Sequence, residues 1–183
     1  DHRFNIVLAC RQSGKSIAVV AYLLWYVIFK GEQVVGVLAN KNAIAREMLS
    51  RITLMLENLP FFLQPGCTTL NKGSIGFSNN SRIIAAATSS SSIRGMSLNL
   101  VYLDEFAFVE NATEFYTSTY PVISSGKTSK IIITSTANGI GNMYHKLYEG
   151  AIQGTNEFKF NSTRNLATHS MVLVILLYQL IYY

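Results

Sequence analysis

Apolar runs of two kinds alternate along residues 3–154, and this alternation predicts the fold. Short apolar runs are typical of strands, and longer runs with helical spacing are typical of helices that pack on a sheet. Strands are predicted at residues 3–9, 34–39, 74–77, 82–87, 98–103 and 130–134. Helices are predicted at residues 16–29, 42–58, 111–120 and 142–154. Strands that alternate with helices predict an α/β fold, in which a parallel sheet carries helices on both faces.

Turn residues set the boundaries of several of these elements. The strands at 74–77 and 82–87 flank Asn79-Asn80, which predicts a hairpin. Residues 60–66 are predicted to form a connector that ends in a Pro-Gly turn. A glycine at position 154 is predicted to close the last helix.

Three of the predicted strands end in polar residues suited to a ligand site. Residues 10–16, with the sequence Cys-Arg-Gln-Ser-Gly-Lys-Ser, follow the first strand. Asp104 and Glu105 follow the strand at 98–103, and Thr134, Ser135 and Thr136 end the strand at 130–134. Ligands of open α/β sheets bind outside the carboxyl ends of the strands. We therefore expect these three polar groups to meet at one rim of the sheet.

The first of these groups has the strand, loop and helix order of a phosphate-binding loop, in which backbone N–H groups and a helix N-terminus face an anion. Gly14 lets the backbone approach the phosphates, Lys15 reaches the β and γ oxygens, and the Ser16 hydroxyl suits Mg²⁺. Gln12 and Ser13 complete the predicted nucleotide-binding loop. The alternative is a Ser/Gly turn with an exposed lysine.

The paired acids suit the chemistry of phosphoryl transfer. Asp104 would hold the Mg²⁺ shell on the same side as Ser16. Glu105 would orient and activate the attacking water as a general base. The alternative is an exposed Asp-Glu pair at a strand-to-loop junction.

Two arginines are candidates for stabilising charge on the γ-phosphate, a role worth about 10³–10⁵ in rate. Arg11 lies inside the loop and could act in cis. Arg94 precedes the strand at 98–103, so strand rise puts it roughly 15–20 Å from the site of its own chain. A neighbouring subunit could present Arg94 in trans. For both residues the alternative is a steering or surface arginine.

Composition narrows the class of protein. An apolar fraction of 49% and a charged fraction of 14% suit a packed α/β domain. The net charge of +5 is compatible with a polyanionic partner. Cys10 and Cys67 lack CxxC spacing, which argues against a zinc site or a disulfide framework, and the reducing cytoplasm is the default compartment.

Several segments resemble the ATPase domain of the large terminase subunit of tailed bacteriophages. The similarity runs from about residue 3 to 160 and keeps the motifs in order. They lie at residues 10–16, 63–66 (Leu-Gln-Pro-Gly), 71–75 (Asn-Lys-Gly-Ser-Ile), 92–95 (Ser-Ile-Arg-Gly), 102–108 (Tyr-Leu-Asp-Glu-Phe-Ala-Phe), 121–126 (Pro-Val-Ile-Ser-Ser-Gly) and 130–139 (Lys-Ile-Ile-Ile-Thr-Ser-Thr-Ala-Asn-Gly).

The resemblance implies a P-loop NTPase of the RecA-like (ASCE) type that uses ATP and Mg²⁺ to package DNA. It places Lys15 and Ser16 in the Walker A motif, and Asp104 with the catalytic Glu105 in Walker B. Residues 134–137 would be the coupling motif, and Arg11 and Arg94 match arginines of the family.

The implied partners are double-stranded viral DNA, a portal protein, a small terminase subunit and a homo-oligomeric ring on the procapsid, with no membrane. The implied location is the host cytoplasm, in a packaging complex that is not retained in the mature virion.

The chain also departs from the family pattern. We expect residues 1–160 to be an ATPase domain without the upstream adenine-binding segment, and we expect no nuclease domain or nuclease activity. Residues 161–183 contain no Asp or Glu and end in an apolar segment, 171–183, that is too short to span a membrane. This tail is either a truncated or frame-shifted end or a strand that completes the sheet. We expect weak ATPase activity from the isolated fragment. The alternative functions are a helicase-type P-loop translocase fragment and a nucleotide-binding module without turnover.

Overall fold

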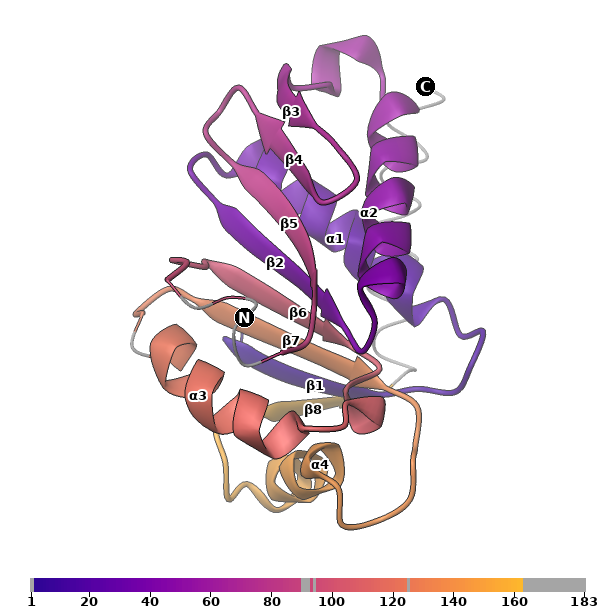
Figure 1. The fold of residues 1–183 in the computed structure, drawn as a ribbon, viewed down its shortest axis with the longest axis vertical. Coiled ribbons are helices and arrows are strands. Elements are labelled where there is room, and N and C mark those ends of the chain that lie inside the picture. The colour runs from indigo at the N-terminus through magenta and orange to yellow at the C-terminus, as the bar shows by residue number, and fades with distance from the viewer. Residues whose placement is uncertain (1, 90–92, 94, 125, 163–183) are drawn as a thin grey trace.

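The computed structural model describes residues 2–89, 93, 95–124 and 126–162. Its centre is an eight-stranded sheet (Figure 1). The strands are β1 (Phe4–Leu8), β2 (Val34–Ala39), β3 (Cys67–Leu70), β4 (Ser74–Phe77), β5 (Arg82–Ala87), β6 (Leu100–Asp104), β7 (Lys130–Ser135) and β8 (Lys159–Ser162). The α-helices are α1 (Lys15–Phe29), α2 (Asn42–Glu57), α3 (Ala112–Ser124) and α4 (Met143–Gln153), and the 3-10 turns are η1 (Phe61–Leu63) and η2 (Phe106–Phe108).

The sheet is mostly parallel, as the sequence predicts, but one edge is mixed. The strand order is β3-β4-β5-β2-β6-β7-β1-β8. All pairs from β5 to β8 are parallel, whereas β4 runs antiparallel to both β3 and β5. The predicted hairpin explains this edge, because a short turn can join only antiparallel strands. Asn80 lies in that turn with a φ of 62°.

Helices cover both faces of the sheet, which confirms the predicted layers. Helices α1 and α2 pack on one face, and α3 and α4 pack on the other (Figure 1). Strand β6 runs between the two cores, and its side chains alternate between them. Leu100 and Tyr102 join the core under α1 and α2, while Val101 and Leu103 join the core under α3 and α4.

Some boundaries differ from the predictions. Helix α3 continues to Ser124, about one turn beyond the predicted end at residue 120, and it contains Pro121. The buried side chain of Ile123 packs that last turn into the core, which offsets the loss of one backbone hydrogen bond at the proline. The connector at 60–66 contains the short turn η1, and Gly154 closes α4 with a φ of 69°, as predicted.

Two strands were not predicted. All four residues of β3 are exposed, so this edge strand carries no apolar pattern. Strand β8 has only four residues and pairs in parallel with β1. It crosses residue 160, where the sequence analysis places the end of the ATPase domain. Arg94 and the tail from residue 163 onward lie outside the described residues. No helix within the described part of the chain has both the length and the apolar character needed to cross a bilayer.

The packing of α2 against the sheet can be tested with two substitutions on that helix. Ile52 is 0% exposed and Leu54 is 61% exposed. Ile52→Ala should lower the free energy of unfolding by about 2–5 kcal/mol, because it leaves a cavity in the core. Leu54→Ala should change it by less than about 0.5 kcal/mol. Urea unfolding measures both, and equal losses would contradict the assigned face of α2.

Candidate active site

The three polar groups at the carboxyl ends of β1, β6 and β7 meet at one rim of the sheet. These strands are neighbours in the order β6-β7-β1, and all are parallel, so their carboxyl ends reach the same edge. The most direct contact between these groups is an ion pair of 2.6 Å between Lys15 Nζ and Glu105 Oε1. The structure thus brings together residues that lie 90 positions apart in the chain.

The loop before α1 has a backbone suited to an anion. Gln12 and Gly14 have φ angles of 60° and 75°, in the left-handed region. Among the described residues, leaving aside the neighbours of Gly14 in the chain, no heavy atom lies within 4 Å of the position that a Cβ of Gly14 would occupy, so the space above this residue is open. The first turn of α1 has no side-chain cap and no acidic residue. Its N–H groups can therefore bind an anionic ligand.

Glu105 is held by several donors. Thr136 donates to Glu105 Oε2 from its backbone N–H at 3.2 Å and from its hydroxyl at 3.0 Å, and Lys15 bonds the other oxygen. Burial alone would raise the pKa of Glu105, but the hydrogen bonds from Lys15 and Thr136 and the Lys15 charge lower this pKa below its ordinary value. The carboxylate is therefore ionised at neutral pH. Its backbone is left-handed, with φ 50° and ψ 43°, an uncommon conformation for a residue other than glycine.

Asp104 is 4% exposed and receives two hydrogen bonds at one oxygen. Tyr102 donates its hydroxyl proton to Oδ1 at 2.7 Å, and the Thr134 hydroxyl donates to the same atom at 2.8 Å. Burial and the Asp104 charge raise the pKa of Tyr102 well above its ordinary value, while hydrogen bonds with Thr134 and Ser16 lower it in part.

The predicted coupling residues contact both acids and the turn that follows them. Thr134 bonds Asp104, and Thr136 bonds Glu105, as described above. The Ser135 hydroxyl accepts the N–H of Ala107 at 3.1 Å. Asn138 Nδ2 donates to the carbonyl of the same alanine at 2.9 Å. The last residue of β7 and the loop after it thus hold the N–H and the carbonyl of one residue in η2, next to Glu105.

The donors at this rim fit a magnesium ion. Ser16 and Asp104 offer hard oxygen ligands, which Mg²⁺ prefers. Among the residues that the structure describes, no three His, Cys, Asp or Glu side chains form a metal cage. In proteins, Mg²⁺ is usually held by one or two protein oxygens, substrate phosphates and water. These two residues would hold the ion with the nucleotide.

The remaining predicted site residues are two residues of the phosphate-binding loop and two arginines. Gln12 and Ser13 are exposed in the loop before α1. Arg11 is exposed beside them, and no hydrogen bond or ion pair joins it to another described residue. Arg94 cannot be placed, because it lies outside the described residues.

Three tyrosine or asparagine side chains at the site were not predicted from the sequence. They are Tyr102, Asn138 and Tyr144, whose hydroxyl donates to the carbonyl of Val7 at 2.7 Å. A signal for Tyr102 exists in the sequence, since residues two apart on a strand share a face. Asn138 and Tyr144 have no such signal, because their contacts depend on how the loop after β7 folds back.

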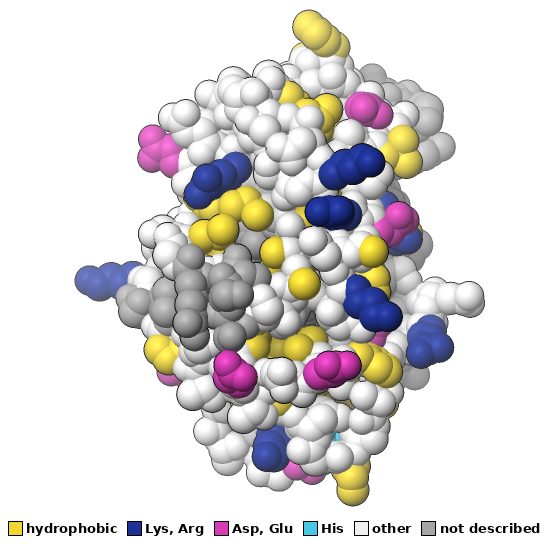
Figure 2. Space-filling model, in the orientation of Figure 1, with side chains coloured by type: hydrophobic (Ala, Val, Ile, Leu, Met, Phe, Trp, Pro, Cys, Tyr) yellow, Lys and Arg dark blue, Asp and Glu magenta, His cyan; other side chains and the backbone are white. Residues whose placement is uncertain are grey.

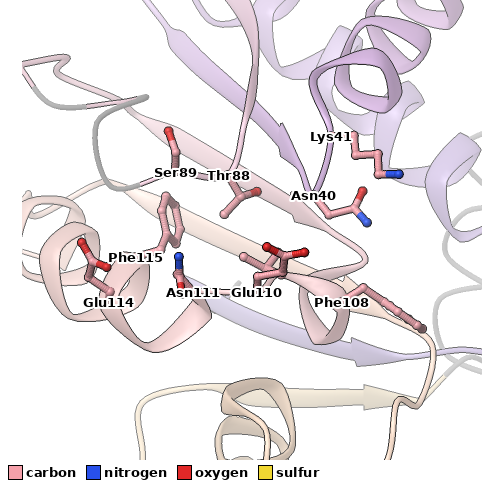
Figure 3. A pocket seen from close by; sticks show the side chains of 10 residues that line it. Asn40, Lys41, Thr88, Ser89, Phe108, Glu110, Asn111, Glu114 and Phe115 are labelled. Atoms are coloured by element: carbon pink, nitrogen blue, oxygen red, sulfur yellow. The ribbon is translucent and has the colours of Figure 1, made fainter.

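A pocket of about 280 Å³ lies on the same rim, at the ends of β2 and β5 (Figure 3). Asn40 and Lys41 line one side, and Glu110 and Glu114 line another. The two carboxylates would repel a phosphate group. The loop before α1, with its open backbone and Lys15, is therefore the better site for a polyanionic ligand.

The fold and this arrangement of residues define a class of protein. A mostly parallel sheet with a phosphate-binding loop after β1 and an Asp-Glu pair after β6 is a P-loop ATPase fold of the RecA-like type. Residues 6–169 match the family described as terminase large subunit, T4likevirus-type, N-terminal. The match spans most of the chain, and the chain belongs to this family.

Solved structures with the same fold are also large terminases. The ATPase domain of the large terminase of Thermus phage P74-26 has a TM-score of 0.69 and 15% identity, and the match covers 96% of this chain and 83% of that one. The bacteriophage HK97 large terminase has a TM-score of 0.71 and 17% identity, with coverage of 88% and 35%. The large terminase of a thermophilic bacteriophage, solved in complex with ADP, has a TM-score of 0.69 and 16% identity, with coverage of 92% and 42%. This chain therefore spans less than half the length of the latter two proteins.

The charge of Glu105 should make stability depend on pH. Because folding lowers the pKa of Glu105 below 4.5, its ionised form stabilises the fold fully above that value, and the contribution is lost as pH falls through the lower native pKa. Glu105→Gln removes this contribution. In urea unfolding, the wild type should be more stable than Glu105→Gln at pH 7, and the difference should shrink as pH falls below 4.5.

A matched control is Glu47→Gln, which removes an exposed ion pair with Arg51 on α2. This variant should change stability little at either pH, because exposed pairs of this kind contribute little. A difference between wild type and Glu105→Gln that stays constant from pH 7 to pH 3 would contradict the assigned hydrogen bonds of Glu105.

Proposed function

We propose that this domain hydrolyses ATP with Mg²⁺ and that the reaction drives double-stranded viral DNA into a procapsid. The observation that carries the proposal is the convergence of Lys15, Asp104 and Glu105 at one rim, beside an open phosphate-binding loop. Membership of the terminase large subunit family supports the same reaction. The ADP bound to one structural neighbour supports the choice of nucleotide.

The residues of the rim suggest the order of events. The phosphates of ATP would bind the N–H groups of the loop before α1, and Lys15 would leave Glu105 to contact the β and γ oxygens. Ser16 and Asp104 would hold Mg²⁺, which neutralises charge on those oxygens. Glu105, still bonded to Thr136, would then orient a water molecule against the γ-phosphorus.

In the chemical step, the water oxygen forms a bond to the γ-phosphorus as the bond to the β–γ bridging oxygen breaks. Glu105 accepts the proton of the water as the general base, and ADP and phosphate are the products. Arg11 in cis, or Arg94 from a neighbouring subunit, would stabilise the charge on the transferred group. An arginine supplied in trans would make the isolated fragment a weak ATPase.

The contacts of the coupling residues suggest how hydrolysis reaches the rest of the domain. Thr136 bonds Glu105, so a change at the carboxylate acts on the loop after β7. Asn138 ties the same loop to Ala107, and α4 begins a few residues later at Met143. Movement of this loop would shift α4, which lies on the face opposite α1.

The surface supports a polyanionic partner. Lys and Arg side chains gather on the half of the molecule formed by α2 and the neighbouring β4–β5 edge (Figure 2). The exposed cations of these elements and their turns are Lys41, Arg46, Arg51, Lys72 and Arg82. Together with the net charge of +5, they favour contact with a DNA backbone.

The remaining partners follow from the family and complete the proposal. The domain would work in a homo-oligomeric ring on the procapsid, together with a portal protein and a small terminase subunit. The ring would act in the cytoplasm of the host and would not remain in the mature virion. We expect no nuclease activity from this part of the chain.

Single-turnover hydrolysis of ATP, at protein concentrations high enough for rings to form, tests the catalytic assignment. Glu105→Gln should bind a fluorescent ADP analogue but lose about 10²–10⁴ in rate, because it lacks the general base. Lys15→Ala should lose both hydrolysis rate and nucleotide affinity.

Glu110→Gln is the matched control, since it removes an equal charge from the neighbouring pocket and should leave the rate unchanged. Two results would count against the proposal: a wild-type rate no faster than that of Glu105→Gln, or unchanged nucleotide affinity in Lys15→Ala. Nucleotide binding without any turnover would identify a binding module.

A further inference from the structure

Tyr102 is a buried polar side chain whose hydroxyl the proposed reaction does not use. It lies in the middle of β6 and is 0% exposed. The strand residues around it, Leu100, Val101 and Leu103, are aliphatic. A phenylalanine would fill the same core without a polar atom, and burying a hydroxyl is costly unless it is hydrogen-bonded. The presence of this hydroxyl therefore calls for a specific partner.

That partner is the carboxylate of Asp104. Tyr102 and Asp104 are two residues apart on β6, so they share one face of the strand. The Tyr102 hydroxyl lies 2.7 Å from Asp104 Oδ1 and 3.0 Å from Thr134 Oγ1. Thr134 pairs with Asp104 across β6 and β7 and lies 2.8 Å from the same carboxylate oxygen. Two hydroxyl groups thus fix the orientation of one carboxylate.

Within the described residues, the hydrogen bonds to the Asp104 carboxylate reach only one of its two oxygen atoms. Both hydrogen bonds reach Oδ1, and no described residue donates a hydrogen bond to Oδ2 of Asp104. The Tyr102 hydroxyl also interacts with Ser16, the first-turn residue of α1 that offers the other oxygen ligand. Of the two residues whose oxygen atoms fit Mg²⁺, Tyr102 therefore hydrogen-bonds Asp104 directly.

We propose that Tyr102 is a positioning residue: its hydroxyl holds Asp104 through Oδ1, so that Oδ2 stays oriented for the metal ion bound with the nucleotide. This inference rests on the proposed function. Tyr102 itself touches neither the metal nor the nucleotide, and its effect passes through Asp104. Hydrogen-bond partners of metal-binding carboxylates commonly change metal affinity by 10–100-fold.

The test is the affinity of the protein–ADP complex for Mn²⁺, a paramagnetic substitute for Mg²⁺, measured by electron paramagnetic resonance. Tyr102→Phe should weaken Mn²⁺ binding by roughly 10–100-fold. Its affinity for ADP in the presence of EDTA should stay at the wild-type value. Its ATP hydrolysis should require more metal ion for half-maximal rate, with the rate recovering at saturating metal.

Tyr26→Phe is the matched control. Tyr26 is also buried in α1, and its hydroxyl donates to Gln33 Oε1 at 2.8 Å, near the far end of that helix. The Tyr26→Phe variant loses a comparable hydrogen bond away from the site, so its Mn²⁺ affinity should equal that of the wild type. If Tyr102→Phe does not fold, Thr134→Val, which removes the other donor to Oδ1, should give the same loss of Mn²⁺ affinity.

The outcomes separate this inference from the proposed function. Wild-type Mn²⁺ affinity in Tyr102→Phe, or in Thr134→Val where Tyr102→Phe does not fold, would overturn the positioning role and leave the proposed function intact. An equal loss of Mn²⁺ affinity in Tyr102→Phe and Tyr26→Phe would also overturn the positioning role, since a general structural effect would explain both losses. A wild-type complex with ADP that binds no Mn²⁺ would overturn the proposed function and this inference together.

Discussion

The ion pair between Lys15 and Glu105 is the interaction on which the rest of the site depends. Both side chains are partly shielded from solvent, where an unpaired charge is costly, so each needs the other until a ligand binds. The pair can form because β7 alone lies between β1 and β6 and all three strands are parallel, so their carboxyl ends lie at one rim. A nucleotide would supply the phosphate charge that replaces Glu105 as the partner of Lys15. Under the proposed function, the same contact would stabilise the empty site and link nucleotide binding to release of the Glu105 carboxylate.

Glu105 and the loop after β7 act as one structural unit. The left-handed backbone of Glu105 is held between β6 and the turn η2, whose Ala107 is fixed by Ser135 and Asn138. Thr136 bonds the carboxylate itself. A change in the hydrogen-bond partners of Glu105 therefore acts directly on the loop that leads into α4. Under the proposed function, this short path would couple hydrolysis to movement of the loop.

The sequence predicted the meeting of Lys15, Asp104 and Glu105 at one rim better than it predicted the edges of the fold. Parallel strands bring their carboxyl ends to one rim, so Lys15, Asp104 and Glu105 could be placed together from the strand pattern alone. The exposed strand β3 and the four-residue strand β8 have no apolar pattern of their own, and only pairing with neighbours makes them strands. Likewise, the hydroxyl of Tyr102 contacts Asp104 on its own strand and Thr134 on the neighbouring strand. Sequence spacing indicates only that Tyr102 and Asp104 share one face of β6.

The most direct test of the central claim is a crystal structure of the wild-type protein with Mn²⁺ and a non-hydrolysable ATP analogue. We expect the Lys15–Glu105 ion pair to be broken and Lys15 to contact the β and γ phosphates. We also expect an anomalous Mn²⁺ signal beside Ser16 and Asp104. A nucleotide bound elsewhere on the molecule, or an intact Lys15–Glu105 pair with the triphosphate in the loop, would contradict the central claim.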